Sequence, residues 1–247
     1  MIQLIRNILA GEGSLWVAWI NHYVIKNKDF YDLSESPTNS WGINKLLKLR
    51  TDARPILDAG ISKTKKIWEE IREKHNKVPW HKVVWFPLHI PKASVITWMA
   101  ILDRLPTRAR LSRMGIPTDG LCVFCNEEIE TRDHLFADCN FAKTLWNSIL
   151  QLTQLQKTHM SWEVRLDWSC RKWKGKSLIS TVMKLAWNTY IYLIWEERNR
   201  RIFQNRTRDV DQLLKIIKEF VRIQLFGRNI NRLDDVNASL CNYWGID

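Results

Sequence analysis

Apolar residues recur at helical spacing along most of the chain, and few stretches alternate apolar with polar residues. The pattern predicts two long helices in the C-terminal half, at 177–203 and 209–225. It also predicts shorter helices at 2–23 (interrupted by two glycines), 63–75, 93–105, 108–114 and 141–155. The clearest β candidate is 82–86, which Pro87 ends. The predicted fold class is therefore mainly α, a helical, bundle-like chain with little β structure.

The same pattern predicts which side of each helix is buried. In 93–105 the apolar face consists of Val95, Trp98, Met99 and Leu102. Each long helix carries one apolar stripe, formed by Ile179, Val182, Ala186, Tyr190 and Ile194 in the first and by Leu213, Ile216, Ile217, Phe220 and Val221 in the second. We expect these faces to form the core.

Shifts in composition divide the chain into four segments. A loop is expected at 34–39, and the composition changes near 157–160 and again after Arg228. We therefore predict a helical connecting region at 1–79, a cysteine-containing domain at 80–156, a basic helical region at 157–228 and a loose tail at 229–247.

The composition excludes several classes of protein. Hydrophobic residues make up 45% of the chain and include 14 tryptophans, which excludes a disordered chain. Five cysteines in 247 residues are too few for a disulfide-stapled miniprotein. No apolar stretch is long enough to span a bilayer, and the first residues lack the pattern of a signal peptide. We expect an intracellular protein with no membrane partner.

The chain is strongly basic, with a formal net charge of +12. The segment 171–228 holds fourteen Lys and Arg residues against five Asp and Glu residues. Such a surplus attracts polyanions at long range. No basic segment has a lipid-seeking face, so nucleic acid (RNA or single-stranded DNA) is the expected partner and a nuclear location is consistent with it.

The most specific chemical feature is a set of three cysteines and one histidine within 18 residues: Cys122, Cys125, His134 and Cys139. Thiolates and imidazoles are the ligands that Zn²⁺ prefers, and a Cys-x-x-Cys turn supplies two of them. Four protein ligands leave no open position, so we predict one structural zinc ion per chain. The competing interpretations are buried cysteines beside an unrelated histidine, or a redox pair.

The residues around this cluster form a longer ordered string. It includes Ile90-Pro91-Lys92, the run from Leu102 to Arg108, Cys122-Val-Phe-Cys125, Glu130-Thr-Arg-Asp-His-Leu-Phe136, Cys139 and the run from Ala142 to Trp146. This string resembles the zinc-binding domain that follows the reverse transcriptase in plant non-LTR (LINE-type) retrotransposons. The segment from Ile194 to Phe203 is similar to the stretch that follows that domain. The resemblance implies that the four residues above bind zinc and that the chain holds RNA or target DNA beside the polymerase module of the same element.

A polymerase, ribonuclease H or endonuclease centre is not recognisable in the chain. Reverse transcriptases need paired carboxylates that hold two magnesium ions. Phe136-Ala-Asp-Cys139 lacks the second carboxylate, and Asp234-Asp235 lacks the preceding aromatic residue. His75, His81 and His89 are interpreted as solvated or capping side chains. We therefore predict no enzymatic activity.

Three groups of residues are candidate nucleic-acid contacts. The first lies just before the cysteine cluster and contains Lys92, Arg104, Arg108, Arg110 and Arg113, of which Arg104 and Arg108 are expected one helical turn apart. The second alternates rings and cations and contains Arg171, Lys172, Trp173 and Lys174. The third contains Arg198, Arg200 and Arg201. Each has a plainer interpretation, as a solvated helix face or as core tryptophans.

The predicted function is a non-catalytic, zinc-stabilised nucleic-acid-binding module. The alternative is a zinc-stabilised protein-interaction scaffold or an inactive remnant of a retroelement.

Overall fold

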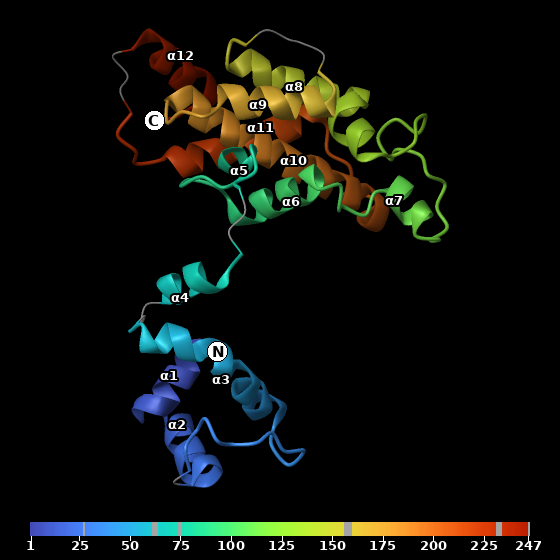
Figure 1. The fold of residues 1–247 in the computed structure, drawn as a ribbon. Coiled ribbons are helices and arrows are strands. Elements are labelled where there is room, and N and C mark those ends of the chain that lie inside the picture. The colour runs from blue at the N-terminus through green and yellow to red at the C-terminus, as the bar shows by residue number, and fades with distance from the viewer. Residues whose placement is uncertain (27, 61–63, 74–75, 156–159, 231–233, 247) are drawn as a thin grey trace. The chain divides into compact units, whose positions relative to one another are not determined.

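The computed structural model describes residues 1–246 except 27, 61–63, 74–75, 156–159 and 231–233. Within the described residues the secondary structure is helical, and the only extended pairing is an isolated antiparallel bridge between Leu121 and Ile129. The predicted mainly α class is confirmed. The chain divides into two compact units, residues 1–76 and 77–247 (Figure 1). The predicted boundary at 156–157 lies outside the described residues.

The first unit is a small helical cluster. Its elements are α1 (Ile2–Ala10), α2 (Leu15–Trp19), the π-helix η1 (Ile20–Ile25), α3 (Trp41–Asp58) and α4 (Thr64–Ile71). Gly11 adopts the left-handed conformation at φ 67° and ends α1, which confirms the interruption predicted within 2–23. The buried residues, among them Ile5, Val17, Ile20 and Leu46, come from α1, α2, η1 and α3.

Helix α3 has no counterpart among the predicted helices. Its sequence is rich in Lys, Arg and Asp and contains Pro55, which weakens the apolar pattern. The side chain of Ser40 accepts a hydrogen bond from the Ile43 amide at the N-terminus of this helix. Ile43, Leu46 and Leu47 then recur at helical spacing and are buried, while α3 packs on α1. This short stripe is the signal that would have revealed the helix.

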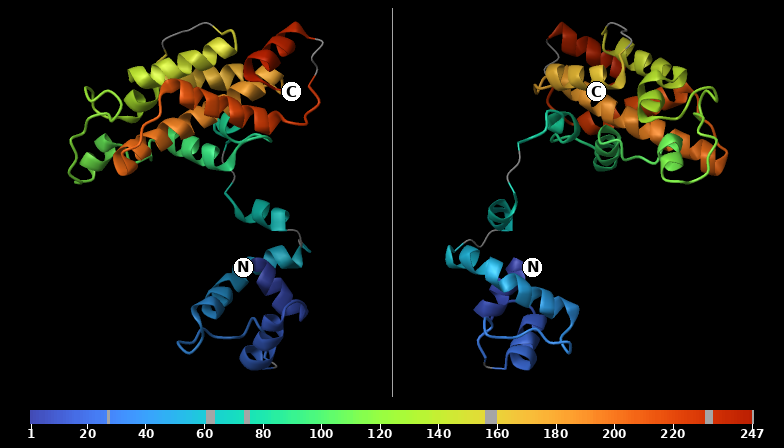
Figure 2. Two further views of the ribbon diagram at one scale, coloured as in Figure 1. Left: turned by 180° about the vertical axis from the view of Figure 1, so that it is seen from behind. Right: turned by 45° about the vertical axis from the view of Figure 1, so that its right-hand side comes forward.

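The second unit is a helical bundle. Its elements are α5 (His81–Val84), α6 (Pro91–Ile101), α7 (Arg108–Arg113), the π-helix η2 (His134–Asp138), α8 (Asn140–Leu152), α9 (Trp162–Lys172), α10 (Leu178–Gln204), α11 (Val210–Leu225) and α12 (Asp235–Trp244). Helix α10 runs through the middle, and α6 and α11 pack along it (Figure 2). Sixteen of its 27 residues are buried, including Trp187 and Leu193 outside the predicted stripe. A helix with buried residues on all sides lies in the core, so α10 is the central helix of the unit.

The strand predicted at 82–86 is wrong, because the chain forms the short helix α5 there. The amide of Trp85 donates to the carbonyl of His81 (2.8 Å), and Val83 and Val84 are both buried. Asn188 of α10 donates to the carbonyl of Val83 (2.9 Å). A run of five residues is too short for periodicity to distinguish a strand from a helical turn.

The loose tail predicted at 229–247 is also wrong. Asp234 caps α12 by accepting from the amide of Val236 (3.1 Å). Leu240, Cys241, Trp244 and Ile246 are buried in the same core as α8 and α10. Their spacing is that of one helix face, and burial against the bundle rather than composition orders the segment.

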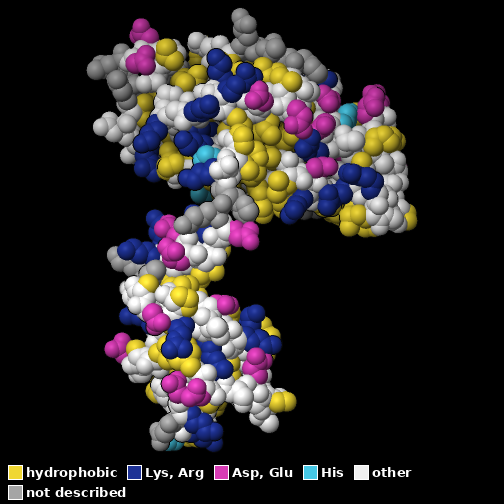
Figure 3. All heavy atoms as spheres, viewed as in Figure 1, with side chains coloured by type: hydrophobic (Ala, Val, Ile, Leu, Met, Phe, Trp, Pro, Cys, Tyr) yellow, Lys and Arg dark blue, Asp and Glu magenta, His cyan; other side chains and the backbone are white. Residues whose placement is uncertain are grey.

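The face of α6 that meets α10 is the opposite of the predicted one. Ala93, Thr97 and Ala100 are buried, because small side chains let the two helices approach closely. Val95 and Trp98 are about two-fifths exposed, and hydrophobic side chains gather over α6 in Figure 3. Among the described residues, none of the helices combines the length and apolar character needed to cross a bilayer.

Candidate metal centre

The four predicted ligands lie together. The sulfur atoms of Cys122, Cys125 and Cys139 and a ring nitrogen of His134 are all within 4.8 Å of one another. The Cys122 and Cys139 Sγ atoms are 3.9 Å apart, and Cys125 Sγ is 3.3 Å from His134 Nε2. A tetrahedral zinc ion places two sulfurs about 3.8 Å apart and a sulfur and a nitrogen about 3.6 Å apart. The four side chains therefore converge closely enough to bind one zinc ion.

A backbone hairpin holds the first two ligands. The amide of Cys122 donates to the carbonyl of Glu128 (2.8 Å), and the amide of Asn126 donates back to the carbonyl of Cys122 (2.8 Å). Asn126 has φ 56°, a left-handed conformation that asparagine tolerates better than most residues. The turn is therefore closed by its own hydrogen bonds, with both sulfurs on one side.

The other two ligands lie at the ends of the π-helix η2. The hydroxyl of Thr131 accepts a hydrogen bond from the amide of His134 (3.1 Å), just before the helical residues begin. The amide of Cys139 donates to the carbonyl of His134 (2.7 Å). A π-helix bonds residues five apart, which brings positions 134 and 139 to the same side. Cys139 is also the N-cap residue of α8.

Burial and mutual contact set the protonation of the ligands. The hydrogen bond from Cys122 to Cys139, with burial, raises the pKa of the Cys122 thiol, and the same hydrogen bond lowers the pKa of Cys139. Burial lowers the pKa of His134 and favours the neutral ring that binds metal. The imidazole is thus favoured in the form that binds metal, and the thiols that still carry protons would release them when zinc binds.

Two stacked aromatic rings and an arginine join the metal loop, residues 122–139 with the four ligands, to the bundle. The rings of Phe124 and Phe141 stack at 4.6 Å with an interplanar angle of 17°. The guanidinium of Arg201 in α10 lies 4.8 Å from each ring centroid. The loop, α8 and α10 are therefore linked by two cation–π contacts of the same arginine.

Glu130 is a second link that the sequence analysis did not single out as a site residue. Its Oε1 accepts from Arg198 Nη2 (2.9 Å) and from the backbone amide of Arg108 (2.9 Å), and it is fully buried. Arg198 lies 68 residues further along the chain, so no local spacing reveals the pair. Glu130 connects the metal loop, α7 and α10.

The third group of candidate contacts is largely internal. Arg198 is buried against Glu130, which leaves it no surface for a phosphate. Arg201 donates to the buried carboxylate of Glu197 (2.9 Å), and Arg200 lies 3.9 Å from the same carboxylate. These arginines neutralise two buried glutamates, so their prediction as an exposed nucleic-acid surface is wrong for Arg198 and unsupported by the geometry of the other two.

The first group divides into structural and exposed members. Arg108 donates to Asp119 (2.6 Å) and to the carbonyl of Leu121 (2.9 Å), and Arg110 donates to the carbonyl of Asp103 (2.6 Å). Arg104 lies in the loop between α6 and α7, so it is not one helical turn from Arg108. Three members are exposed at the surface: Lys92, Arg104 and Arg113.

The second group loses its stacking platform. Trp173 is buried, with its ring centroid 5.4 Å from that of Trp168 and 6.1 Å from that of Trp187. It is a core residue, as the plainer interpretation had it. Arg171 pairs with Asp167 on the same helix (2.6 Å), and Lys172 and Lys174 are exposed.

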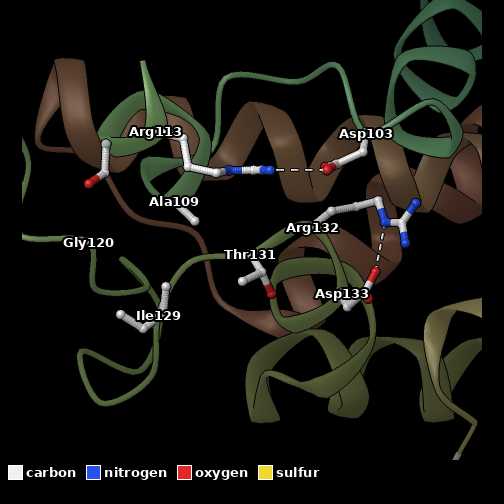
Figure 4. A pocket seen from close by; sticks show the side chains of 9 residues that line it. Asp103, Ala109, Arg113, Gly120, Ile129, Thr131, Arg132 and Asp133 are labelled. Carbon is white, nitrogen blue, oxygen red and sulfur yellow. Dashed lines mark hydrogen bonds and ion pairs between the residues drawn. The ribbon is translucent and has the colours of Figure 1, made fainter. Parts of the chain in front are cut away.

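A cleft of about 440 Å³ lies between α7 and the metal loop (Figure 4). Its lining includes Arg113 and Arg132 and the hydroxyl-bearing residues Ser112 and Thr131. Arg113 pairs with Asp103 (3.6 Å) and Arg132 with Asp133 (2.7 Å). Arg132 was not among the predicted contacts, although it belongs to the motif around His134.

The remaining candidates have ordinary roles. Ring nitrogens of His81 and His89 lie 2.8 and 2.6 Å from the carbonyls of Val78 and Phe86, which fits their interpretation as capping side chains. His75 lies outside the described residues. In the part of the chain that the structure describes, the cysteine–histidine cluster is the one group of three or more potential ligands close enough to share a metal.

Comparison with known proteins assigns the segment that contains the site. Residues 63–146 match the family model described as zinc-binding in reverse transcriptase. No curated protein and no solved structure matches the chain. The matched segment covers about a third of the sequence and includes all four ligands, Arg108 and Glu130. With the ligand geometry above, residues 63–146 are therefore identified as a segment similar to the zinc-binding domain of reverse transcriptase.

Proposed function

We propose that this protein is a non-catalytic nucleic-acid-binding module that holds the RNA template or the DNA target of a reverse transcriptase. The proposal extends to an origin in a plant non-LTR retrotransposon, which the motif string from Ile90 to Trp146 supports. The observation that carries it is the placement of exposed arginines, Arg104 and Arg113, on the segment that the metal loop holds in position.

The metal loop positions these arginines through backbone contacts. When bound, zinc fixes the four ligand side chains relative to one another. Glu130 then holds the start of α7, since its side chain accepts from the amide of Arg108 and its carbonyl from the amide of Ala109 (3.2 Å). Arg110 in turn holds the loop that carries Arg104, through the carbonyl of Asp103. Hydrogen bonds of Glu130 and Arg110 thus fix the segment that carries Arg104 and Arg113.

These arginines are free to exchange partners. Arg113 pairs with Asp103 at 3.6 Å, and 67% of its side chain is exposed. Exposed ion pairs of this kind contribute about 0–1 kcal/mol, so a phosphate competes easily with the carboxylate. Residues 77–247 contain 26 Lys and Arg residues against 17 Asp and Glu residues, which attracts a polyanion to the unit as a whole.

One observation favours the second candidate function, a protein-interaction scaffold. Helix α6 exposes Val95, Trp98 and Leu102 along one side. An apolar helix face on a folded unit is a common feature of protein interfaces. Under this alternative the zinc ion serves only to hold the helices that present the face.

Binding measured by fluorescence anisotropy separates the two functions. The zinc-loaded 247-residue chain is titrated into labelled single-stranded RNA and DNA at several salt concentrations between about 50 and 200 mM. We expect affinity to fall with salt, and the double variant Arg104→Ala/Arg113→Ala to lower the slope of log K against log salt by about 1.4. Arg228→Ala removes an exposed charge outside the candidate surface and serves as the matched control. A salt-independent affinity, or one that the double variant leaves unchanged, contradicts the proposal.

A further inference from the structure

The first unit carries a group of exposed aromatic side chains that the proposed function does not use. Trp16, Trp19 and Tyr23 lie on the consecutive helices α2 and η1, and 39%, 48% and 57% of their surfaces are exposed. Aromatic residues of this size are normally buried in a small folded unit. Their shared exposure on one side of a helix indicates a binding surface.

The three rings are arranged as a row. They are three and four residues apart, so they share one helix face. The ring centroids of Trp19 and Tyr23 are 5.7 Å apart, with a tilt of 33°. His22 packs edge-on against Tyr23 at 4.7 Å and limits the movement of that ring.

The other side of the groove is lined by polar residues in a loop that hydrogen bonds hold. A groove of about 630 Å³ runs between the rings and residues 38–40, just before α3. Asn44 holds this loop, since its side chain donates to the carbonyl of Ser36 (2.9 Å) and accepts from the amide of Ser36 (3.3 Å). Thr38, Asn39 and Ser40 line the groove, and their side chains carry two hydroxyls and a carboxamide. Its described lining contains no charged side chain.

We propose that this groove binds the unpaired bases of a single-stranded nucleic acid. A nucleobase has an uncharged aromatic face and an edge of hydrogen-bond donors and acceptors. The row of rings provides faces for stacking, and Thr38, Asn39 and Ser40 provide partners for the edges. The inference rests on the proposed function. It adds a second site, in residues 1–76, which binds bases, whereas the arginines near α7 contact phosphates.

A proline-rich peptide is the other occupant that an aromatic groove admits. Two observations favour bases. The carboxamide of Asn39 can both donate to and accept from a base edge, and its Nδ2 is 3.3 Å from Asn44 Oδ1, which orients it. The net charge of +12 concentrates a polyanion near the chain but does nothing for an uncharged peptide.

The test compares how two labelled oligomers of equal length, one of deoxythymidine and one of abasic sites, bind to the 247-residue chain. Trp19→Ala and Tyr23→Ala should each weaken binding of the thymidine oligomer roughly 5- to 150-fold and leave the abasic oligomer unaffected. Trp19→Phe keeps a ring and should retain most of the affinity. Trp41→Ala, which removes an exposed ring outside the groove lining, should change neither affinity. Circular dichroism checks that each variant is folded.

The outcomes separate the two proposals. If the wild-type protein binds the thymidine oligomer and neither Trp19→Ala nor Tyr23→Ala weakens it, the groove proposal is wrong and the proposed function stands. An equal loss for both oligomers also overturns the groove proposal, because abasic sites offer nothing to stack. If decaproline binds and Trp19→Ala abolishes only that binding, the groove is a peptide site. If the wild-type protein binds no oligomer at all, both proposals fail together.

Discussion

Glu130 and Arg198 form a buried ion pair that ties the metal loop to the central helix α10. Arg198 Nη2 lies 2.9 Å from Glu130 Oε1, and the two side chains are 4% and 0% exposed. Glu130 also accepts from the amide of Arg108 at the start of α7. The pair therefore joins three elements that the sequence separates by up to 90 residues.

Breaking this pair from one side should destabilise the second unit strongly. We expect Arg198→Met to cost about 3–5 kcal/mol in the free energy of unfolding, because it leaves the Glu130 carboxylate buried without its counterion. Urea unfolding followed by circular dichroism measures the cost. The double variant Glu130→Gln/Arg198→Met should recover part of it, since no unpaired charge remains. Equal stability of Arg198→Met and the wild type would show that the pair is not buried in solution.

Loss of one metal ligand should remove zinc and lower the stability of the second unit. Elemental analysis should find one zinc per wild-type chain and none in Cys139→Ser. We expect the thermal midpoint of this variant to fall by at least about 10 °C, because zinc binding and folding of the loop are coupled. Cys170→Ser, which alters a partly buried thiol outside the cluster, is the matched control and should keep its zinc.

The metal ligands could be predicted because their determinants are local. Cys122, Cys125, His134 and Cys139 lie within 18 residues, and cysteine and histidine are themselves the usual zinc ligands. The short hairpin and the π-helix that orient them add only a few hydrogen bonds. The predicted existence of most helices was right for a similar reason, because their apolar spacing is visible within one segment.

The errors arose where distant residues decide burial. The local sequence predicts that Arg198 is an exposed cation. In the fold it is buried beside Glu130, which lies 68 residues earlier in the chain. The local sequence also predicts that the more apolar face of α6 is buried. In the fold α10 packs against Ala93 and Ala100 on the other face. Neither contact can be predicted from the spacing of apolar residues within a single segment. Exposure of charged and aromatic side chains, on which binding surfaces depend, is therefore the part that sequence patterns predict least well.

Trp173 should behave as a core residue. Its ring packs between Trp168 and Trp187 and is 3% exposed. We expect Trp173→Ala to cost about 3–5 kcal/mol in the free energy of unfolding. The conservative Trp173→Phe should cost less and should leave oligonucleotide affinity unchanged. A folded Trp173→Phe variant with greatly weakened binding would restore this residue as a stacking contact.

Lys184 should make the stability of the second unit depend on pH in the alkaline range. Burial, with the nearby charge of Lys82, lowers the pKa of Lys184 below its usual value of 10.5. Between that lowered pKa and 10.5 the unfolded chain binds more protons than the folded one, so stability rises with pH across this window. Below the window the cost of burying the charge is fully present, offset in part by the hydrogen bond from Lys184 Nζ to the carbonyl of Gly175 (3.0 Å).

We expect Lys184→Met to be more stable than the wild type by about 1 kcal/mol at pH 7, and the difference to shrink as the pH approaches 10.5. Urea unfolding at both pH values measures it, with the exposed Lys172→Met as control. A difference that stays constant with pH would mean that Lys184 keeps its charge at no cost inside the bundle.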